Sequence, residues 1–259
     1  MTIKAIHQST LGSWLRCGEA FRRRYIEGEI IPPGIAARRG SGTHKAVEIN
    51  HRQKIKSGVD LPLGDLKDAA RDEFVRLIKD EGVFIPKEQL SEKDKILNEG
   101  LNQTIQATEI YRGEIAPKIQ PVRVEERITV DVPGIALPIS GTLDAEDDKG
   151  FIQDLKVMKR KSQAAADRDP QPGFYYLLRK GLTGEWPAGF KYQLIIPNKT
   201  MLHEEITTYR NMAQIKILFR YIEQFLNDLK TGSFKPADPG HWLCHPEWCG
   251  FYRDCKYSS

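Results

Sequence analysis

The stretch ISGTLDAEDDKGFIQDLKV (residues 139–157) predicts a β-hairpin. Its two arms, residues 139–145 and 151–157, are short and alternating, and a polar turn with Gly150 at its far end joins them. Successive side chains on a strand point to opposite faces. Asp154 and Lys156 therefore project from one face, with the apolar Leu155 and Val157 on the other.

Asp144 lies near the end of the partner arm, where it could approach Asp154 and Lys156. Two carboxylates and a lysine on one sheet face are typical of a divalent-metal site with a cationic helper. A solvated hairpin face with a surface ion pair is the alternative, and such a pair contributes little to stability. The hairpin alone does not decide between these two interpretations.

Bulk composition sets the first limits. With 259 residues the chain is long enough for one large domain or two small ones, and a net charge of +4 permits a nucleic-acid partner without requiring one. No apolar run approaches the roughly 20 residues of a membrane span, and the N-terminus has no apolar signal region. We therefore expect an intracellular protein without a membrane partner.

Two helices are predicted before the hairpin. The first runs from Ser9 to Glu27 and contains Cys17; its arginines at 22–24 either favour the negative end of the helix dipole or contact phosphates. The segment 40–44, Gly-Ser-Gly-Thr-His, leads into the second. There His44, Glu48 and His51 share one face. A lone histidine is usually structural, but one that follows a glycine-rich stretch is a better ligand candidate when carboxylates gather elsewhere.

Residues 61–117 show helical periodicity and no chemical motif, so we expect a helical cap beside a sheet. Residues 122–132 then alternate as a strand, and Glu126 interrupts its apolar face. A carboxylate buried there needs a partner, a metal or a raised pKa, whereas an edge position or a salt bridge is the alternative.

After the hairpin the pattern predicts a helix from about Asp169 to Lys180, a strand at Lys191–Ile196 and a long helix from about His203 to Lys230. Helices, three strands, a helix, a strand and a helix in this order predict an α/β fold (mixed α+β). Its central mixed sheet would be flanked by helices.

The tail contains Cys244, Cys249 and Cys255 in a loop with prolines and glycines, and Cys17 could supply a fourth thiolate from the first helix. Disulfides are not expected in a reducing compartment. Metal or cluster binding is the favoured interpretation, and independent buried thiols are the alternative.

Taken together, these features resemble the RecB-like branch of the PD-(D/E)xK nucleases. They are most similar to its iron–sulfur members, which include CRISPR-associated adaptation exonucleases and AddB-type nucleases. The resemblance rests on five stretches in family order: residues 40–44 with His44, residues 141–144 with Asp144, Asp154-Leu155-Lys156, residues 171–175 with Gln171 and Tyr175, and the four cysteines. It implies one restriction-endonuclease-like domain over 1–259, with a helical N-terminal part and cap (1–117), a catalytic core (118–232) and a cysteine-rich tail (233–259).

The resemblance implies a metal-dependent deoxyribonuclease, and within that class an exonuclease. Mg²⁺ or Mn²⁺ would be held by His44, Asp144, Asp154 and the Leu155 carbonyl, and a histidine ligand tilts the site toward Mn²⁺. Lys156 would position the attacking water or stabilise developing charge. Gln171 and Tyr175 would orient substrate or Lys156, and Glu126 would contact Lys156 or a second metal.

Cofactor, partners and setting follow from the same resemblance. The four cysteines, 17, 244, 249 and 255, would hold a 4Fe-4S cluster; structural zinc stays open because four residues separate Cys244 from Cys249. The substrate would be single- or double-stranded DNA with a free end, bound by basic residues at 22–24 and 159–161. Recombination, repair or CRISPR adaptation in the cytoplasm of a bacterium or phage host is the expected setting. A non-catalytic DNA-binding module with a zinc-stapled tail and a restriction-type endonuclease are the alternatives.

Overall fold

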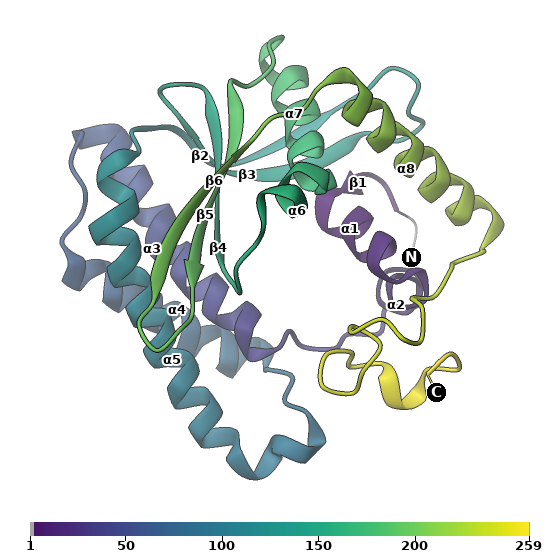
Figure 1. Cartoon of the computed structure of the whole chain (residues 1–259), viewed down its shortest axis with the longest axis horizontal. Coiled ribbons are helices and arrows are strands. Elements are labelled where there is room, and N and C mark those ends of the chain that lie inside the picture. Colours follow the sequence, from purple (N-terminus) through teal and green to yellow (C-terminus); the bar gives the residue numbers. More distant parts are fainter. Residues whose placement is uncertain (1–2, 259) are drawn as a thin grey trace.

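A six-stranded mixed sheet lies at the centre of the computed structural model, which describes residues 3–258 (Figure 1). The strands are β1 (Ile6–His7), β2 (Pro121–Val130), β3 (Ile139–Asp147), β4 (Phe151–Val157), β5 (Gly189–Ile196) and β6 (Leu202–Thr208). Their order is β1-β3-β4-β5-β6, and β2 also pairs with β3. β1 is parallel to β3 and β4 is parallel to β5, while the β2–β3, β3–β4 and β5–β6 pairs are antiparallel. The mixed sheet flanked by helices confirms the expected fold class.

The hairpin β3–β4 is closed by a short turn and then opens. Asp147 Oδ1 accepts hydrogen bonds from the backbone N–H of Lys149 (3.0 Å) and Phe151 (2.9 Å), and Gly150 takes the left-handed conformation that the turn requires (φ 77°). Only two residue pairs join the strands, and the one farther from the turn is Ala145–Gln153. Asp144 and Asp154 are therefore the first residues beyond the paired part, where the two strands separate.

Helices cover both faces of the sheet. One group is α3 (Ile35–Ser57), α4 (Leu63–Glu81) and α5 (Lys93–Ile110), which share an apolar cluster with Leu155, Val157 and Ile195 of the sheet. The other comprises α1 (Gln8–Arg16), α2 (Gly18–Phe21), α6 (Gln163–Arg168), α7 (Pro170–Thr183) and α8 (Met212–Thr231), packed on the opposite cluster. Short helical turns lie at Arg22–Glu27, Lys87–Glu92, Tyr111–Ile115, Ala116–Lys118 and Tyr252–Asp254. No helix in the described range 3–258 is long and apolar enough to cross a membrane.

Two predicted helices differ from the structure near the N-terminus. The helix expected over Ser9–Glu27 is broken at Cys17, whose backbone is extended (φ −162°, ψ 107°). The break lets the next residue, Gly18, approach the tail, and its N–H donates to the Lys235 carbonyl at 2.7 Å. The segment 40–44 lies inside α3 rather than before it. A Cβ at Gly42 would be 2.8 Å from Thr104 and 2.9 Å from the Ala70 carbonyl, so this glycine allows close helix packing.

The long helix expected from His203 begins later. Residues 202–208 form β6 instead, because pairing with β5 satisfies the backbone groups of that strand. Helix α8 starts at Met212, where the Asn211 side chain caps it and Gln214 completes a capping box.

Candidate active site at the opening of the hairpin

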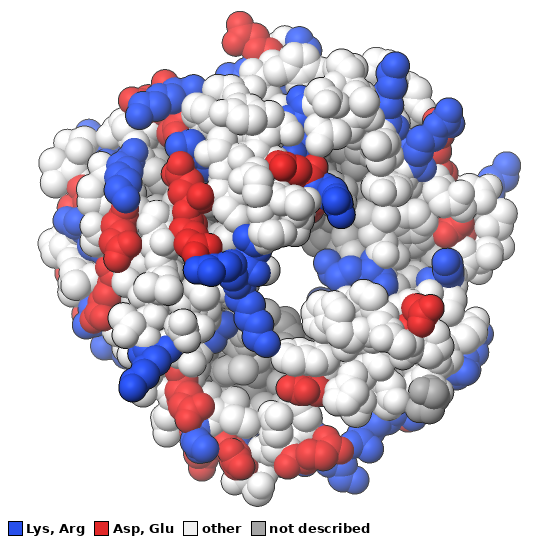
Figure 2. All heavy atoms as spheres, in the orientation of Figure 1, with Lys and Arg blue, Asp and Glu red and all other residues white. Residues whose placement is uncertain are grey.

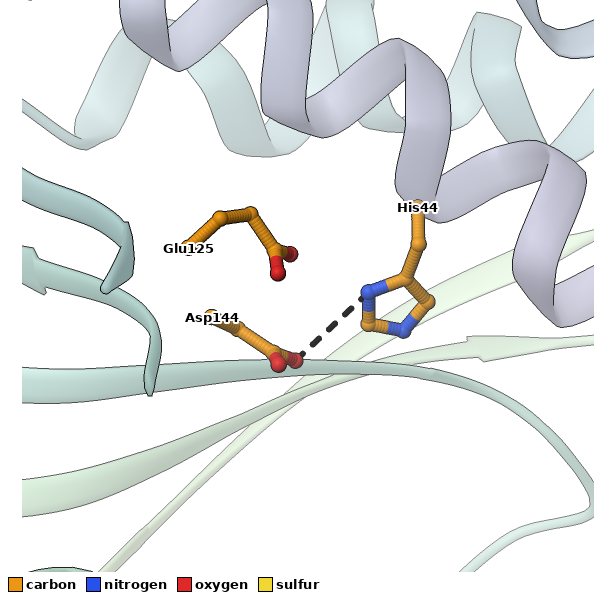
Figure 3. A group of neighbouring side chains, drawn as sticks. All are labelled: His44, Glu125 and Asp144. Carbon is orange, nitrogen blue, oxygen red and sulfur yellow. Dashed lines mark ion pairs between the residues drawn. The ribbon is translucent and has the colours of Figure 1, made fainter. Parts of the chain in front are cut away.

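His44 on α3 reaches the opening of the β3–β4 hairpin. Its Nε2 lies 2.8 Å from the Leu155 carbonyl oxygen, and its Nδ1 lies 3.5 Å from Asp144 Oδ2 (Figure 3). The histidine and the first acid, 100 residues apart in sequence, therefore lie side by side. The Leu155 carbonyl lies beside the same ring.

Glu125 completes a cluster with His44 and Asp144, and it was not predicted (Figure 3). One potential ligand atom from each of the three lies within 4.8 Å of the others. The β2–β3 pairs Val124–Ala145 and Glu126–Leu143 place Glu125 opposite Asp144. Its backbone has φ 45°, a conformation that a residue with a side chain adopts at a cost of about 1–3 kcal/mol and that often marks functional sites. Burial, and then the charge of Asp144, raises the pKa of Glu125 to about 7.

Glu126, the acid that the alternating pattern singled out, is not in this cluster. Its carboxylate is 3.0 Å from Arg123 and its side chain is 36% exposed. The structure therefore shows Glu126 in a salt bridge, which was the alternative to a role in the site. Glu125 and Glu126 are adjacent in sequence, and strand alternation placed Glu125 on the polar face. Only the pairing register of β2 with β3 shows that Glu125 is the acid that lies in the site.

Asp154 and Lys156 form the second half of the site. Asp154 Oδ1 accepts from Lys156 Nζ at 2.8 Å and from Gln171 Nε2 at 3.0 Å, where Gln171 lies in the first turn of α7. Burial, countered by Lys156 and reinforced by Asp144, raises the pKa of Asp154 to about 6. Burial acts to lower the pKa of Lys156, but Asp154 and Asp144 outweigh it, so the pKa is raised and the lysine stays cationic.

Two carboxylate oxygens in the site fit a bound cation. Within residues 3–258, Asp144 Oδ2 and Asp154 Oδ2 are buried and have no hydrogen-bond partner. A buried carboxylate oxygen without a partner is costly, and coordination to a cation removes that cost. Carboxylate and carbonyl oxygens with one imidazole suit Mg²⁺ or Mn²⁺. The donor set therefore agrees with a divalent-metal site.

Tyr175 lies beside the same acids. It is 9% exposed, and burial, followed by the charges of Asp144, Asp154 and Glu125, raises its pKa. Of the predicted site residues, His44, Asp144, Asp154, Leu155, Lys156, Gln171 and Tyr175 meet at the opened hairpin.

All four cysteines line one cavity of about 290 Å³ between the N-terminal helices and the tail. They are free thiols, and the Cys17 sulfur accepts from the backbone N–H of Ala20 (3.4 Å) and Ala237 (3.3 Å). Burial and the neighbouring cysteines raise the pKa of Cys244 and Cys249. Four sulfurs from the two ends of the chain thus face a common space.

The arginines at 22–24 are mostly engaged within the fold. Arg22 pairs with Glu19 and Glu27, and Arg23 pairs with Glu29. Arg24 is exposed. In the second basic run Lys159 is exposed, Arg160 pairs with Glu204 and Lys161 pairs with Asp169. Most of the basic side chains at 22–24 and 159–161 therefore form ion pairs with acidic side chains of the same chain.

A mixed sheet whose central hairpin opens beside two acids and a lysine defines a restriction-endonuclease-like domain. Residues 6–258 match the sequence profile of the PD-(D/E)XK nuclease superfamily, and the chain belongs to that superfamily. Membership supports a nuclease acting on nucleic acid, and PD-(D/E)XK nucleases typically use divalent metals such as Mg²⁺.

Among solved structures, a chain from Eubacterium rectale named putative exonuclease is similar, with a TM-score of 0.57 and 13% identity over 99% of this chain and 90% of that one. At this identity the likeness shows the fold alone. The protein SSO0001 aligns with a TM-score of 0.35 and 17% identity over 91% of this chain and 100% of its own. No curated protein matches the sequence.

Proposed function

We propose that the chain is a metal-dependent deoxyribonuclease that removes nucleotides from DNA ends. The observation that carries this proposal is the pair of buried carboxylate oxygens of Asp144 and Asp154 that accept no hydrogen bond from the described residues, beside His44, the Leu155 carbonyl and a cationic lysine.

His44, Asp144, Asp154 and the Leu155 carbonyl would hold Mg²⁺ or Mn²⁺, with Glu125 as an additional acid. When bound, the cation would lower the pKa of a water and neutralise charge on the scissile phosphate. Among the described residues, Lys156 Nζ forms an ion pair with Asp154 alone, and the lysine side chain is one-third exposed, so its Nζ can also reach a phosphate oxygen. It would stabilise the negative charge that develops there.

Gln171 and Tyr175 would act on the site from α7. Gln171 donates to the same Asp154 oxygen that holds Lys156, which leaves Asp154 Oδ2 free to face a cation. Tyr175, buried next to three acids and with a raised pKa, stays protonated and can donate a hydrogen bond. The hydrogen bond from Gln171 would help to fix the orientation of Asp154.

The surface around the site favours a strand with an end. Figure 2 shows an opening in the middle of this face with lysine and arginine side chains on its rim. In the same view, β4, which carries Asp154 and Lys156, lies beside this opening (Figure 1), and Lys159 and Arg160, which follow β4 in the chain, are exposed. A free DNA end could thread into such an opening, whereas a closed circle could not.

For the cysteine cavity we propose a 4Fe-4S cluster that ties α1 and α2 to the tail. The two N–H groups that donate to the Cys17 sulfur are favourable to a thiolate ligand. Four cysteine thiolates are a ligand set for a 4Fe-4S cluster and also for tetrahedral zinc, so metal analysis has to distinguish the two.

The substrate proposal is tested with linear and closed circular DNA, single- and double-stranded, in Mg²⁺ or Mn²⁺. We expect linear DNA to be degraded from its ends and circles to persist. Cleavage of the circle would show a restriction-type endonuclease, and binding without cleavage would show a non-catalytic module. An activity on ends would fit work in recombination, repair or CRISPR adaptation.

The cluster proposal is tested by iron analysis and visible absorbance of anaerobically purified protein. We expect iron and a broad visible absorption band that vanish in Cys244→Ala. Stoichiometric zinc without iron would contradict the cluster.

A further inference from the structure

His51 is a buried polar side chain that the proposed reaction does not use. It lies on α3 seven residues after His44, hence on the same helix face, and it is 2% exposed. In the part of the chain that the structure describes, neither ring nitrogen has a hydrogen-bond partner. Its one ring contact is an edge-to-face arrangement with Tyr111, with centroids 5.8 Å apart.

Both nitrogens need a partner in the folded protein. Burial, and then the charge of Lys54, lowers the pKa of His51 to about 4, so the ring is neutral near neutral pH. A neutral imidazole has one N–H donor and one acceptor nitrogen. Leaving both unsatisfied in the interior would be costly, and buried polar groups are nearly always bonded to protein or water.

A small cavity between His51 and the acids of the site provides room for that partner. Its volume is about 20 Å³, and its polar walls are His44, His51, Glu125, Asp144, Gln153 and Gln193. A space of this size holds about one water molecule, provided that several polar groups face it.

The two glutamines already have partners across the sheet. Gln153 Nε2 donates to Asp147 at 2.7 Å, Gln193 Nε2 donates to Gln153 at 3.0 Å, and His203 Nε2 lies 2.7 Å from Gln193 Oε1. This chain fixes the direction of both amides. Among the described residues that line the cavity, His51 and Asp144 have buried polar atoms without a hydrogen-bond partner, and Asp144 belongs to the proposed metal site.

We propose that this cavity is a binding site for one water molecule held by His51, and that His51 acts through this water to position Glu125 and Asp144. The inference rests on the proposed metal site. His51 touches neither substrate nor cation and is a positioning residue. Replacing a group that hydrogen-bonds to the metal ligands typically lowers metal affinity by about 10–100-fold.

The test replaces His51 with Phe, which keeps a ring but removes both nitrogens, and with Gln, which restores donor and acceptor. The matched control is Tyr111→Phe, which alters another residue that lines the cavity and removes a hydroxyl that accepts a hydrogen bond from Asn50 Nδ2 (2.8 Å). Mn²⁺ affinity is measured from the electron paramagnetic resonance signal of free Mn²⁺, and thermal unfolding of the metal-free protein is followed alongside.

We expect His51→Phe to weaken Mn²⁺ binding about 10-fold or more, His51→Gln to recover most of it, and Tyr111→Phe to stay within about 2-fold. The opposite result is a His51→Phe variant that binds Mn²⁺ like the wild type and melts at a higher temperature. That outcome would mean a dry cavity, because removing unpartnered polar atoms from a dry core stabilises it.

Should His51→Phe not fold, the crystal structure of the wild-type protein decides. Electron density for a water within hydrogen-bonding distance of a His51 nitrogen supports the proposal, and its absence overturns it. Neither readout requires turnover. A wild-type protein that binds Mn²⁺ but leaves DNA intact would contradict the proposed function and leave this water site standing.

Discussion

Replacing Asp154 with Asn is expected to stabilise the metal-free protein and abolish its activity. Asn keeps an oxygen that can accept from Lys156 and Gln171, and it places an uncharged amide group where Oδ2 is buried without a partner in the described structure. The change removes the negative charge of a buried carboxylate, and that charge destabilises the folded protein when no metal is bound. A substitution that merely damaged the fold would have the opposite sign.

The size of the effect follows from the pKa of Asp154, which is raised from 3.8 to about 6. Each pKa unit corresponds to about 1.4 kcal/mol, so ionised Asp154 costs the fold about 3 kcal/mol. The attraction of Lys156 is already included, because the pKa compares both forms of the carboxyl beside that lysine. A raised carboxyl pKa means that the folded protein binds the proton more tightly than the unfolded chain does. The cost is therefore absent below about pH 4, grows between pH 4 and 6, and is complete at higher pH.

The assay is thermal unfolding of EDTA-treated wild type and Asp154→Asn at pH 5 and pH 8, repeated with Mn²⁺. For a chain of this length, about 3 kcal/mol raises the melting temperature of the variant by roughly 6–10 °C at pH 8, with about half of that at pH 5. Mn²⁺ should stabilise the wild type and have little effect on the variant, because binding to the folded state shifts unfolding by mass action. DNA degradation should fall about 100-fold or more.

A variant that is less stable than the wild type at pH 8 without metal would refute this reasoning. It would show that Asp154 is a stabilising partner of Lys156 rather than a strained carboxylate. Equal stabilisation of both proteins by Mn²⁺ would remove Asp154 from the metal site.

Three further predictions test neighbouring parts of the account. Glu125→Gln should weaken Mn²⁺ binding about 10-fold, whereas its neighbour Glu126→Gln should leave it unchanged in titration calorimetry; equal effects would contradict the geometry of β2. Because the pKa of Glu125 is about 7 and protons compete with the cation, wild-type Mn²⁺ affinity should rise between pH 6 and 8, and a flat profile would exclude this linkage. Gly18→Ala should cost about 1–3 kcal/mol in urea unfolding because its Cβ would lie 2.6 Å from the Lys235 carbonyl, and a neutral effect would show that the tail is not packed there.

Local periodicity predicted much of the fold. The hairpin at 139–157 and the faces of Asp154 and Lys156 follow from strand alternation, and the helical stretch at 61–117 follows from helical spacing. The position of Gln171 at the start of α7 follows from the prolines around it. Each of these depends on residues close together in sequence.

Features that depend on distant contacts were not predictable in this way. Glu125 rather than Glu126 enters the site because of the register between β2 and β3. Residues 202–208 form a strand because β5 is there to pair with them. The helix breaks at Cys17 where the tail packs against Gly18. The division into cap, core and tail, and the cluster itself, stay predictions.

The most direct test of the central claim is degradation of end-labelled linear DNA by purified wild type and Asp144→Asn, with Mn²⁺ or with EDTA. Asp144 contributes both to the cluster with His44 and to the electrostatic environment of Asp154. We predict degradation by the wild type only when the cation is present, and none by a folded variant. Degradation in EDTA, or full Mn²⁺-dependent activity of Asp144→Asn, would contradict a metal-dependent nuclease site at the opened hairpin.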